Sequence, residues 1–337
     1  MVIRNTHSFI LLFIVLCVGC DNDEPEMHRE FVAFGNINFT PFYWHNGRAN
    51  RLEGYTVYIT DGAVLGDDIY ALGYVNDGET YAGAVYWKNG KMFKLSTEGR
   101  NDVPTAIAIS GDDIYIAGFE DKGLESIALY WKNGERIVVS GEDGFARPTD
   151  IAVSGSDVHL VGWAQNRVDY PDSTLAAYWK NGVRIKLNAE SRTEQINSIV
   201  ISGSDVYFTG ETYNRPDFYP TARIWKNGEP TDFIGRGDRS YGKRIVTIGA
   251  DVYVAGEDGT NAVYWKNGMV TPLETGAISD SDVNGMVTVD GHLIISGTNY
   301  QDGHTYQGSF VWIDGETVFP FSGLDPAFVI NCIAANP

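Results

Sequence analysis

Two stretches of the sequence combine the residue types that bind polar ligands. Residues 163–172 and 211–220 both contain Asn-Arg-x-Asp followed by an aromatic residue. Arginine forms forked hydrogen bonds, carboxylates and amides add directional ones, and aromatic rings offer flat surfaces for stacking. This combination suits a glycan or a peptide. The candidate ligand-binding residues are Trp163, Asn166, Arg167, Asp169 and Tyr170 in the first stretch and Tyr213, Asn214, Arg215, Asp217, Phe218 and Tyr219 in the second.

A purely structural interpretation of these stretches is equally open. If the two arose by duplication, Arg167 and Arg215 would pair with the aspartates two positions later and stiffen their own loops. Trp163 argues in the other direction, because it is the one tryptophan outside the repeat series described below. Functional residues also concentrate on loops that a rigid scaffold holds in place.

Motifs of catalysis and metal binding are missing from the sequence. It has no nucleophile elbow, no His-Glu-x-x-His and no phosphate-binding loop. Its histidines share no spacing expected of a metal site. We therefore expect no catalytic residues, no cofactor and no metal, and a non-catalytic protein is favoured over an enzyme. A glycan hydrolase or lyase stays an alternative, and it would need a pair of suitably spaced carboxylates.

The charge of the chain narrows its partners. The formal net charge is −19 and the isoelectric point is about 4.6. Such a chain repels the phosphates of nucleic acids and an anionic membrane surface. Nucleic acid is therefore excluded as a partner.

The elements that must position the two stretches belong to a repeat. A Tyr-Trp-Lys-Asn-Gly motif or a close variant recurs, and its tryptophans are 40 to 48 residues apart, the range of propeller blades. A second motif, apolar-x-apolar-Ser-Gly-x-Asp-Val-Tyr-x-x-Gly, lies between the copies. The repeat tryptophans are Trp44, Trp87, Trp131, Trp179, Trp225, Trp265 and Trp312.

Each repeat resolves into four strands. The apolar run ending in Ser-Gly is the first strand, Asp-Val-Tyr-x-x-Gly the second, the run ending in Tyr-Trp the third, and a short run after Asn-Gly the fourth. Asn-Gly permits positive φ at both turn positions and marks a hairpin. The sequence thus predicts an all-β fold. The variable loops between second and third strands are expected on the same rim as the loops that lead from each fourth strand to the next blade.

The two chain ends predict how the ring closes. Residues 31–35, 43–44 and 48–52 match the second, third and fourth strands of a repeat, and residues 330–335 match the first. One blade is therefore completed by both ends, which hides the last sheet edges. This arrangement predicts a seven-bladed β-propeller. A solenoid of hairpins is the alternative, although it would need no matching half-units at the ends.

The repeated aromatic residues are interpreted as scaffold. A tryptophan required in every blade fills the space between neighbouring blades, with its N–H bonded to the backbone. His159 occupies the position of Tyr70, Tyr115, Tyr207 and Tyr253 in other repeats, so it is interpreted as a packing residue rather than a ligand or base.

The Trp-Lys-Asn-Gly units resemble HAF-type extracellular repeats. In that family an Ala-rich strand is paired with Trp, a turn Gly and a later Leu. The similarity covers most of the mature chain, but the preceding strand here reads Ser-Gly-x-Asp-Val-Tyr instead. It implies an extracellular propeller and specifies no ligand.

The N-terminus resembles a bacterial lipoprotein signal. Arg4, the apolar run 9–18 and then Gly19-Cys20 match a lipobox, except that Cys17 stands where Leu is usual. The resemblance implies cleavage before Cys20 and lipid attachment to it. The acidic residues that follow are similar to the export signal of Bacteroidetes surface lipoproteins. An ordinary secretory signal cut nearby is the alternative.

We therefore expect a lipoprotein signal at 1–20, an acidic flexible tether at 21–29 and the propeller at 30–337. The expected protein is a cell-surface lipoprotein, anchored in the outer membrane, that binds a glycan or protein partner on its variable-loop rim. A scaffold subunit of an outer-membrane complex is a further alternative, and it rests on fold analogy alone.

Overall fold

The computed structural model describes residues 31–38, 40–54, 57–76, 82–96, 100–139, 144–165, 174–187, 194–213, 219–232, 239–274, 280–301, 305–318 and 328–336. All regular secondary structure in these ranges is β-strand, as the repeats predict. Over the same ranges, no helix has the length and apolar character needed to cross a bilayer.

The strands follow the repeat. In chain order they are β1 (Phe31–Ile37), β2 (Thr40–His45), β3 (Arg48–Arg51); β4 (Val57–Leu65), β5 (Asp68–Asn76), β6 (Ala82–Lys88), β7 (Lys91–Lys94); β8 (Asp102–Ser110), β9 (Asp113–Asp121), β10 (Ser126–Lys132), β11 (Glu135–Val138); β12 (Phe145–Ser154), β13 (Asp157–Gln165), β14 (Thr174–Lys180), β15 (Val183–Ile185). They continue as β16 (Glu194–Ser202), β17 (Asp205–Tyr213), β18 (Pro220–Lys226), β19 (Glu229–Asp232); β20 (Ser240–Ile248), β21 (Asp251–Asp258), β22 (Asn261–Lys266), β23 (Met269–Pro272); β24 (Asp280–Val289), β25 (His292–Gln301), β26 (Thr305–Ile313), β27 (Glu316–Val318); and β28 (Phe328–Ala335).

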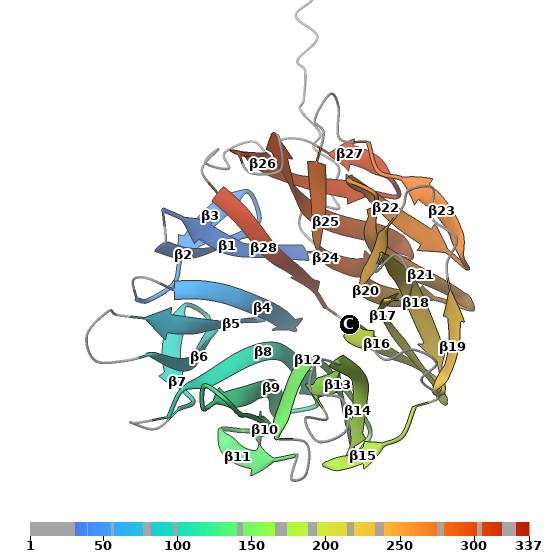
Figure 1. The fold of residues 1–337 in the computed structure, drawn as a ribbon. Coiled ribbons are helices and arrows are strands. Elements are labelled where there is room, and N and C mark those ends of the chain that lie inside the picture. Colours follow the sequence, from blue (N-terminus) through green and yellow to red (C-terminus); the bar gives the residue numbers. More distant parts are fainter. Residues whose placement is uncertain are drawn as a thin grey trace, which may run out of the picture.

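The strands form a propeller (Figure 1). Five sheets have four antiparallel strands each, and a sixth has eight. The two halves of the eight-stranded sheet, β8–β11 and β12–β15, are joined by one parallel pair, Ser126 with Phe145. Separated at that pair, the strands are consistent with the seven predicted blades. The first strands of the units lie around the ring axis, each in contact with the next.

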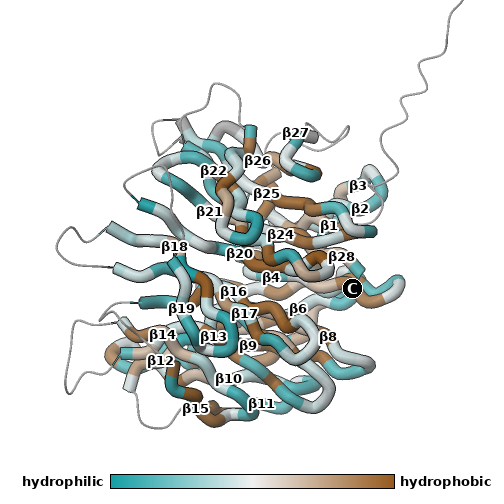
Figure 2. Tube along the Cα trace, turned by 90° about the vertical axis from the view of Figure 1, so that its right-hand side faces the viewer, coloured by the Kyte–Doolittle hydropathy of each residue, from teal (hydrophilic) through white to brown (hydrophobic). Residues whose placement is uncertain are grey.

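Both chain ends complete one sheet, as predicted. Its strand order is β28-β1-β2-β3, with Phe31 opposite Ala335 and Ile37 opposite Phe328. Asn336, just after β28, holds Gly66 in the β4–β5 turn: its side-chain oxygen accepts from the Gly66 N–H at 2.7 Å, and its amide donates to the Gly66 carbonyl at 3.1 Å. The C-terminus thus lies on the rim of the tight turns, which Figure 2 shows from the side.

A cluster of polar side chains explains the repeated Lys-Asn-Gly and Asp-Val-Tyr motifs. In the β8–β11 unit, Lys132 pairs with Asp113 at 2.8 Å, lies 5.1 Å from the centre of the Tyr115 ring, and is followed by Asn133, which donates to Asp113 at 2.7 Å. Asn133 has φ 52°, as its turn requires, and its side-chain oxygen accepts from the Ile114 N–H. The bond to Lys132 is the main cause of the lowered pKa of Asp113. The Asp–Lys pair and the Asn donor recur from β5 to β22.

The tryptophans pack between blades, as predicted. All the repeat tryptophans are at most 1% exposed. In β6, Val85 and Trp87 contact one hydrophobic cluster, whereas Ala84 and Tyr86 contact another, so both faces of the strand are buried. The Trp87 N–H donates to the Glu53 carbonyl at 2.8 Å, but those of Trp131 and Trp225 have no hydrogen-bond partner among the described residues, so the prediction of a backbone bond for every repeat tryptophan is wrong.

His159 is a packing residue, which confirms its interpretation. Its side chain is buried, its ring stacks on Tyr178 with 5.9 Å between ring centres, and its Nδ1 lies 2.8 Å from the Tyr178 hydroxyl.

Candidate functional site

A β-bulge recurs in the first strand of every unit. One residue in each of these strands is skipped by the register of the neighbouring second strand. Bulges bend a strand and redirect a side chain. We call the skipped residues the bulge ring: Thr60, Thr105, Thr149, Asn197, Lys243, Asn284 and Asn331.

The glycine that ends the Asp-Val-Tyr-x-x-Gly motif makes room for the bulge. A Cβ on Gly256 would lie 1.9 Å from the carbonyl oxygen of Tyr241, and one on Gly210 would lie 2.0 Å from that of Gln195. The corresponding glycines of the other units face the same backbone obstacle. Glycine inside a strand commonly marks such a close backbone approach.

The bulge ring links neighbouring units. Thr149 donates to the Ile196 carbonyl at 2.6 Å, Asn197 to that of Gly242 at 2.9 Å, and Asn284 to that of Ile330 at 2.7 Å. Each acceptor immediately precedes the next bulge residue. Side-chain hydrogen bonds therefore join successive first strands around part of the axis, and they hold the polar residues in fixed positions.

The axis contains a cavity of about 210 Å³ lined by all the first strands. Its charged residues are Asp61, Asp150 and Arg244. Burial, together with the nearby Asp150, raises the pKa of Asp61 to about 7. Each aspartate accepts a backbone N–H from the next unit at 2.9 Å, Asp61 from Ile107 and Asp150 from Ile199. These two carboxylates therefore help to join the blades.

A wider pocket of about 600 Å³, which we call the mouth, opens above this cavity. It shares Arg244 and four bulge-ring residues with the cavity, and it lies at the starts of the first strands and the ends of the second strands. That is the rim of the variable loops. Its polar and aromatic lining includes Gln195, Asn197, Glu211, Tyr213, Tyr241 and Lys243.

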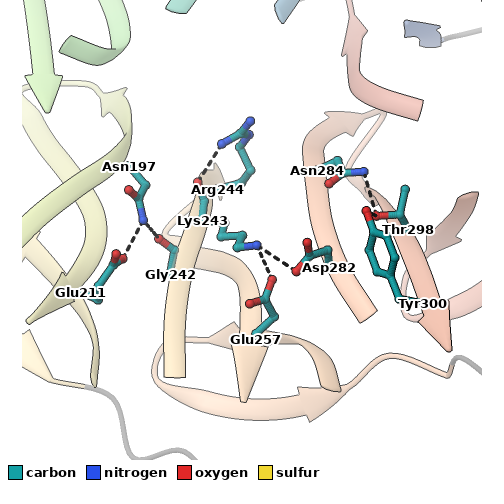
Figure 3. A network of polar contacts seen from close by, with 10 residues as sticks. All are labelled: Asn197, Glu211, Gly242, Lys243, Arg244, Glu257, Asp282, Asn284, Thr298 and Tyr300. Atoms are coloured by element: carbon teal, nitrogen blue, oxygen red, sulfur yellow. Dashed lines mark hydrogen bonds and ion pairs between the residues drawn. The ribbon is translucent and has the colours of Figure 1, made fainter. Parts of the chain in front are cut away.

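Glu211 is the acidic residue in the lining of the mouth, with 1% of its surface exposed. Gln195 donates to one carboxylate oxygen. Asn197 donates to the other at 2.7 Å, as Figure 3 shows. Burial raises the pKa of Glu211 to about 7, against the lowering effect of these two amides and of Lys243. A carboxylic acid with such a pKa changes charge near neutral pH.

Two acidic residues, Glu257 and Asp282, share one cation, Lys243. Figure 3 shows the Lys243 ammonium directed at both Glu257 and Asp282, and its distance to Asp282 is 3.2 Å. Burial raises the pKa of Glu257 to about 7, against the lowering effect of Lys243. Burial acts to raise the pKa of Asp282 as well, but its bonds to Glu257 and Lys243 outweigh this and leave it lowered.

The aromatic residues of this rim form two groups. Tyr213 and Tyr241 line the mouth, and burial raises the pKa of Tyr213 to about 12. On the preceding unit, the Arg147 guanidinium lies 4.4 Å from the ring centre of Phe119 and 5.6 Å from that of Trp163. Trp163 directly follows the glycine of β13, the position that Glu211 occupies in β17.

The structure places three of the predicted ligand-binding residues. Tyr213 lines the mouth, Trp163 is half-buried in the Arg147 stack, and Tyr219 is 53% exposed in a separate pocket of about 580 Å³. Trp163 and Tyr213 lie on strands, not on the loops to which the sequence assigned them. The others, Asn166, Arg167, Asp169, Tyr170, Asn214, Arg215, Asp217 and Phe218, lie outside the described residues, as does Cys20.

Sequence reasoning missed the main residues of the mouth. Gln195, Tyr241 and Lys243 lie in first strands, which were interpreted as scaffold. Glu211 was included in the second stretch only as the start of a loop. The available signal was the glycine at the end of each Asp-Val-Tyr-x-x-Gly motif, inside the second strand, because it marks the bulge opposite. Among the described residues, no group of three or more His, Cys, Asp or Glu side chains is arranged to hold a metal.

Comparisons with known proteins identify no family. No family model matches the sequence, and no curated protein does. Among solved structures, a puromycin-hydrolysing peptidase of Mycobacterium tuberculosis has a TM-score of 0.51 at 11% identity, over 76% of this chain and 44% of the peptidase. A mutant sialidase of Trypanosoma rangeli has a TM-score of 0.48 at 8% identity, over 84% and 58% of the two chains. The β-propeller domain of the trilobed protease of Pyrococcus furiosus has 0.46 at 13%, over 78% and 84%. At these identities the similarity concerns the fold alone.

Proposed function

We propose that this propeller is a non-catalytic binding module whose mouth takes a glycan. The observation that carries the proposal is the mouth itself, a pocket of about 600 Å³ with two tyrosines and several fixed hydrogen-bonding groups. Binding pockets typically combine a few well-placed polar groups with flat or apolar walls. A glycan offers hydroxyls to Gln195 and Asn197 and C–H faces to Tyr213 and Tyr241.

Pre-organisation favours binding at this place. Asn197 is held by Glu211 and by the Gly242 carbonyl, and Lys243 is held by two acidic groups. Side chains that are already fixed lose little conformational entropy when a ligand binds. The mouth is also built on strands, which position groups more rigidly than loops do.

We further propose that the protein is lipid-anchored at the cell surface through Cys20. Phe31, the first of the described residues, pairs with Ala335 at the tight-turn rim. A tether that joins β1 there leaves the mouth on the opposite rim, directed away from the membrane. This geometry supports an outward-facing binding site.

The test is a thermal unfolding screen of the full-length chain in detergent with neutral, amine-bearing and acidic oligosaccharides. A ligand that binds only the folded state raises the unfolding midpoint, because it adds RT ln(1 + [L]/Kd) to stability. We expect at least one glycan to raise the midpoint in a concentration-dependent manner. A screen in which no glycan does so would contradict the proposal.

A glycan hydrolase is the second candidate, and one observation favours it. Glu211 lines the mouth and has a pKa of about 7, as a general acid requires. Incubation of any glycan that binds, followed by analysis of reducing ends, separates the two candidates. The binding module leaves the glycan intact, whereas the hydrolase releases new ends, and Glu211→Gln abolishes that release.

A further inference from the structure

Glu211 differs from Glu194 and Asp102, two other deeply buried acidic residues, in its partners. Glu194 pairs with Arg223 at 2.6 Å, and Asp102 pairs with Arg136 at 3.4 Å. Among the described residues, Glu211 forms no ion pair, and its side-chain partners are the neutral amides of Gln195 and Asn197. A buried charge without a counter-charge is costly. Among the described residues Glu211 therefore has no ion-pair partner, and the only cation that acts on it is the nearby Lys243.

The nearest cation of the mouth is committed elsewhere. Lys243 pairs with both Glu257 and Asp282, on the side of β20 away from Glu211 (Figure 3). Arg244 donates to the Lys243 carbonyl at 3.1 Å and lines the axial cavity. Glu257 and Asp282 line a separate pocket, so the charged residues that line the mouth are Glu211, Lys243 and Arg244, and among the described residues neither cation is bonded to Glu211.

The hydrogen bonds at Glu211 favour its ionised form. Each of its oxygens receives one amide N–H, and an ionised carboxylate can accept about four hydrogen bonds. Acceptor capacity therefore remains on both oxygens. Tyr213 and Tyr241 line the same pocket, and aromatic faces attract cations. The net charge of −19 also draws cationic ligands toward the protein.

We propose that the mouth selects a glycan that carries a free, protonated amine, and that the ammonium group binds Glu211. This inference rests on the proposed function and specifies its ligand class. An ammonium has three N–H donors, so it can bond both carboxylate oxygens and still contact a tyrosine. A neutral N-acetylated sugar of the same length lacks the charge that would compensate Glu211.

The test compares two matched ligands by isothermal titration of the full-length chain in detergent. The probes are a glucosamine tetramer, with free amines, and its fully N-acetylated counterpart, at low salt and at about pH 7, where Glu211 is partly ionised and the amines are partly protonated. We expect the free-amine tetramer to bind at least about tenfold more tightly, because truncation of a buried charge pair has a large effect on affinity. Glu211→Gln should abolish this preference.

A matched variant controls for the overall charge. Glu135→Gln changes the net charge equally, but Glu135 is an exposed residue beside the β10–β11 turn, on the opposite rim. It should leave the preference unchanged. If Glu135→Gln and Glu211→Gln had the same effect, the preference would come from the net charge and the inference would be wrong.

The remaining outcomes separate the inference from the function on which it rests. Equal affinity for both tetramers would refute the inference and leave the glycan-binding function standing. Binding of neither tetramer, together with a thermal screen in which no glycan raises the midpoint, would refute the function itself. Oligolysine that binds through Glu211 while no glycan does would assign the mouth to a cationic peptide and refute the glycan class.

Discussion

Burial of Glu211 predicts a specific dependence of stability on pH. Its pKa is about 7 in the folded protein, against a model value of 4.5. The folded state therefore binds a proton at a higher pH than the unfolded state does. Between about pH 4.5 and 7, unfolding releases this proton, so stability falls as pH rises. Above pH 7 the carboxylate is ionised in both states, and the full cost of its burial is present.

The magnitude follows from the size of the pKa difference. One pKa unit corresponds to about 1.4 kcal/mol, so a difference of roughly 2.5 units contributes about 3 kcal/mol. Glu211→Gln removes the titrating group and keeps its shape. The variant also loses one hydrogen-bond acceptor toward Gln195 or Asn197, which costs about 1 kcal/mol at every pH. The free energy of unfolding of the variant, minus that of the wild type, should therefore increase by about 3 kcal/mol from pH 4 to pH 8.

The measurement is urea unfolding of both proteins at several pH values from 4 to 8. The groups around Glu211 are Gln195 and Asn197 on β16, Tyr213 on its own strand, and Tyr241 and Lys243 on β20. Lys243 stays charged over this range, because Glu257 and Asp282 raise its pKa despite burial. The tyrosine pKa values are raised as well, so these residues stay neutral. A difference between variant and wild type that is constant across the range would refute the reasoning.

Three further predictions concern the scaffold. Arg223→Met breaks the buried ion pair with Glu194 and should destabilise the protein by about 3 to 5 kcal/mol. Lys132→Met breaks an exposed pair and should cost less than about 1 kcal/mol, and denaturant unfolding of both variants compares the two. Gly256→Ala should lower the thermal midpoint sharply, because its Cβ meets the Tyr241 carbonyl, whereas an unchanged midpoint would show that the bulge opposite does not require glycine. Trp131 is fully buried, so Trp131→Ala should lower the free energy of unfolding by about 3 to 5 kcal/mol. Trp163→Ala should cost less in the same unfolding assay, because this variant mainly loses stacking on Phe145 and Arg147. An equal loss in both variants would contradict the half-buried position of Trp163.

The repeat made the fold predictable from the sequence. The Trp-Lys-Asn-Gly motif located the hairpins, and Asn89 and Asn133 have the positive φ that this turn requires. The half-units at the two ends predicted the pairing of β28 with β1. These features depend on local turn chemistry and on alternation along strands, and both can be read from adjacent residues.

The candidate site was less predictable, because it depends on contacts between units. A bulge shifts one strand against its neighbour, and it places Asn197 and Lys243 at the mouth although their repeats look regular. The lack of an ion pair at Glu211 among the described residues follows from the side chains of β16 and β20 together. No single repeat contains that information. Of the predicted residues, Tyr213 alone is placed in the mouth among those described.

The most direct test of the proposed binding site compares two tyrosines from the same predicted stretch. Tyr213 lines the mouth, whereas Tyr219 is exposed in a different pocket. The measurement is isothermal titration of the glycan found in the thermal screen into the wild type, Tyr213→Ala and Tyr219→Ala. If the mouth binds the glycan, Tyr213→Ala weakens binding at least about tenfold, consistent with the loss of a central aromatic contact, and Tyr219→Ala binds like the wild type. Wild-type affinity in Tyr213→Ala, with binding lost in Tyr219→Ala, would place the site outside the mouth and contradict the proposal.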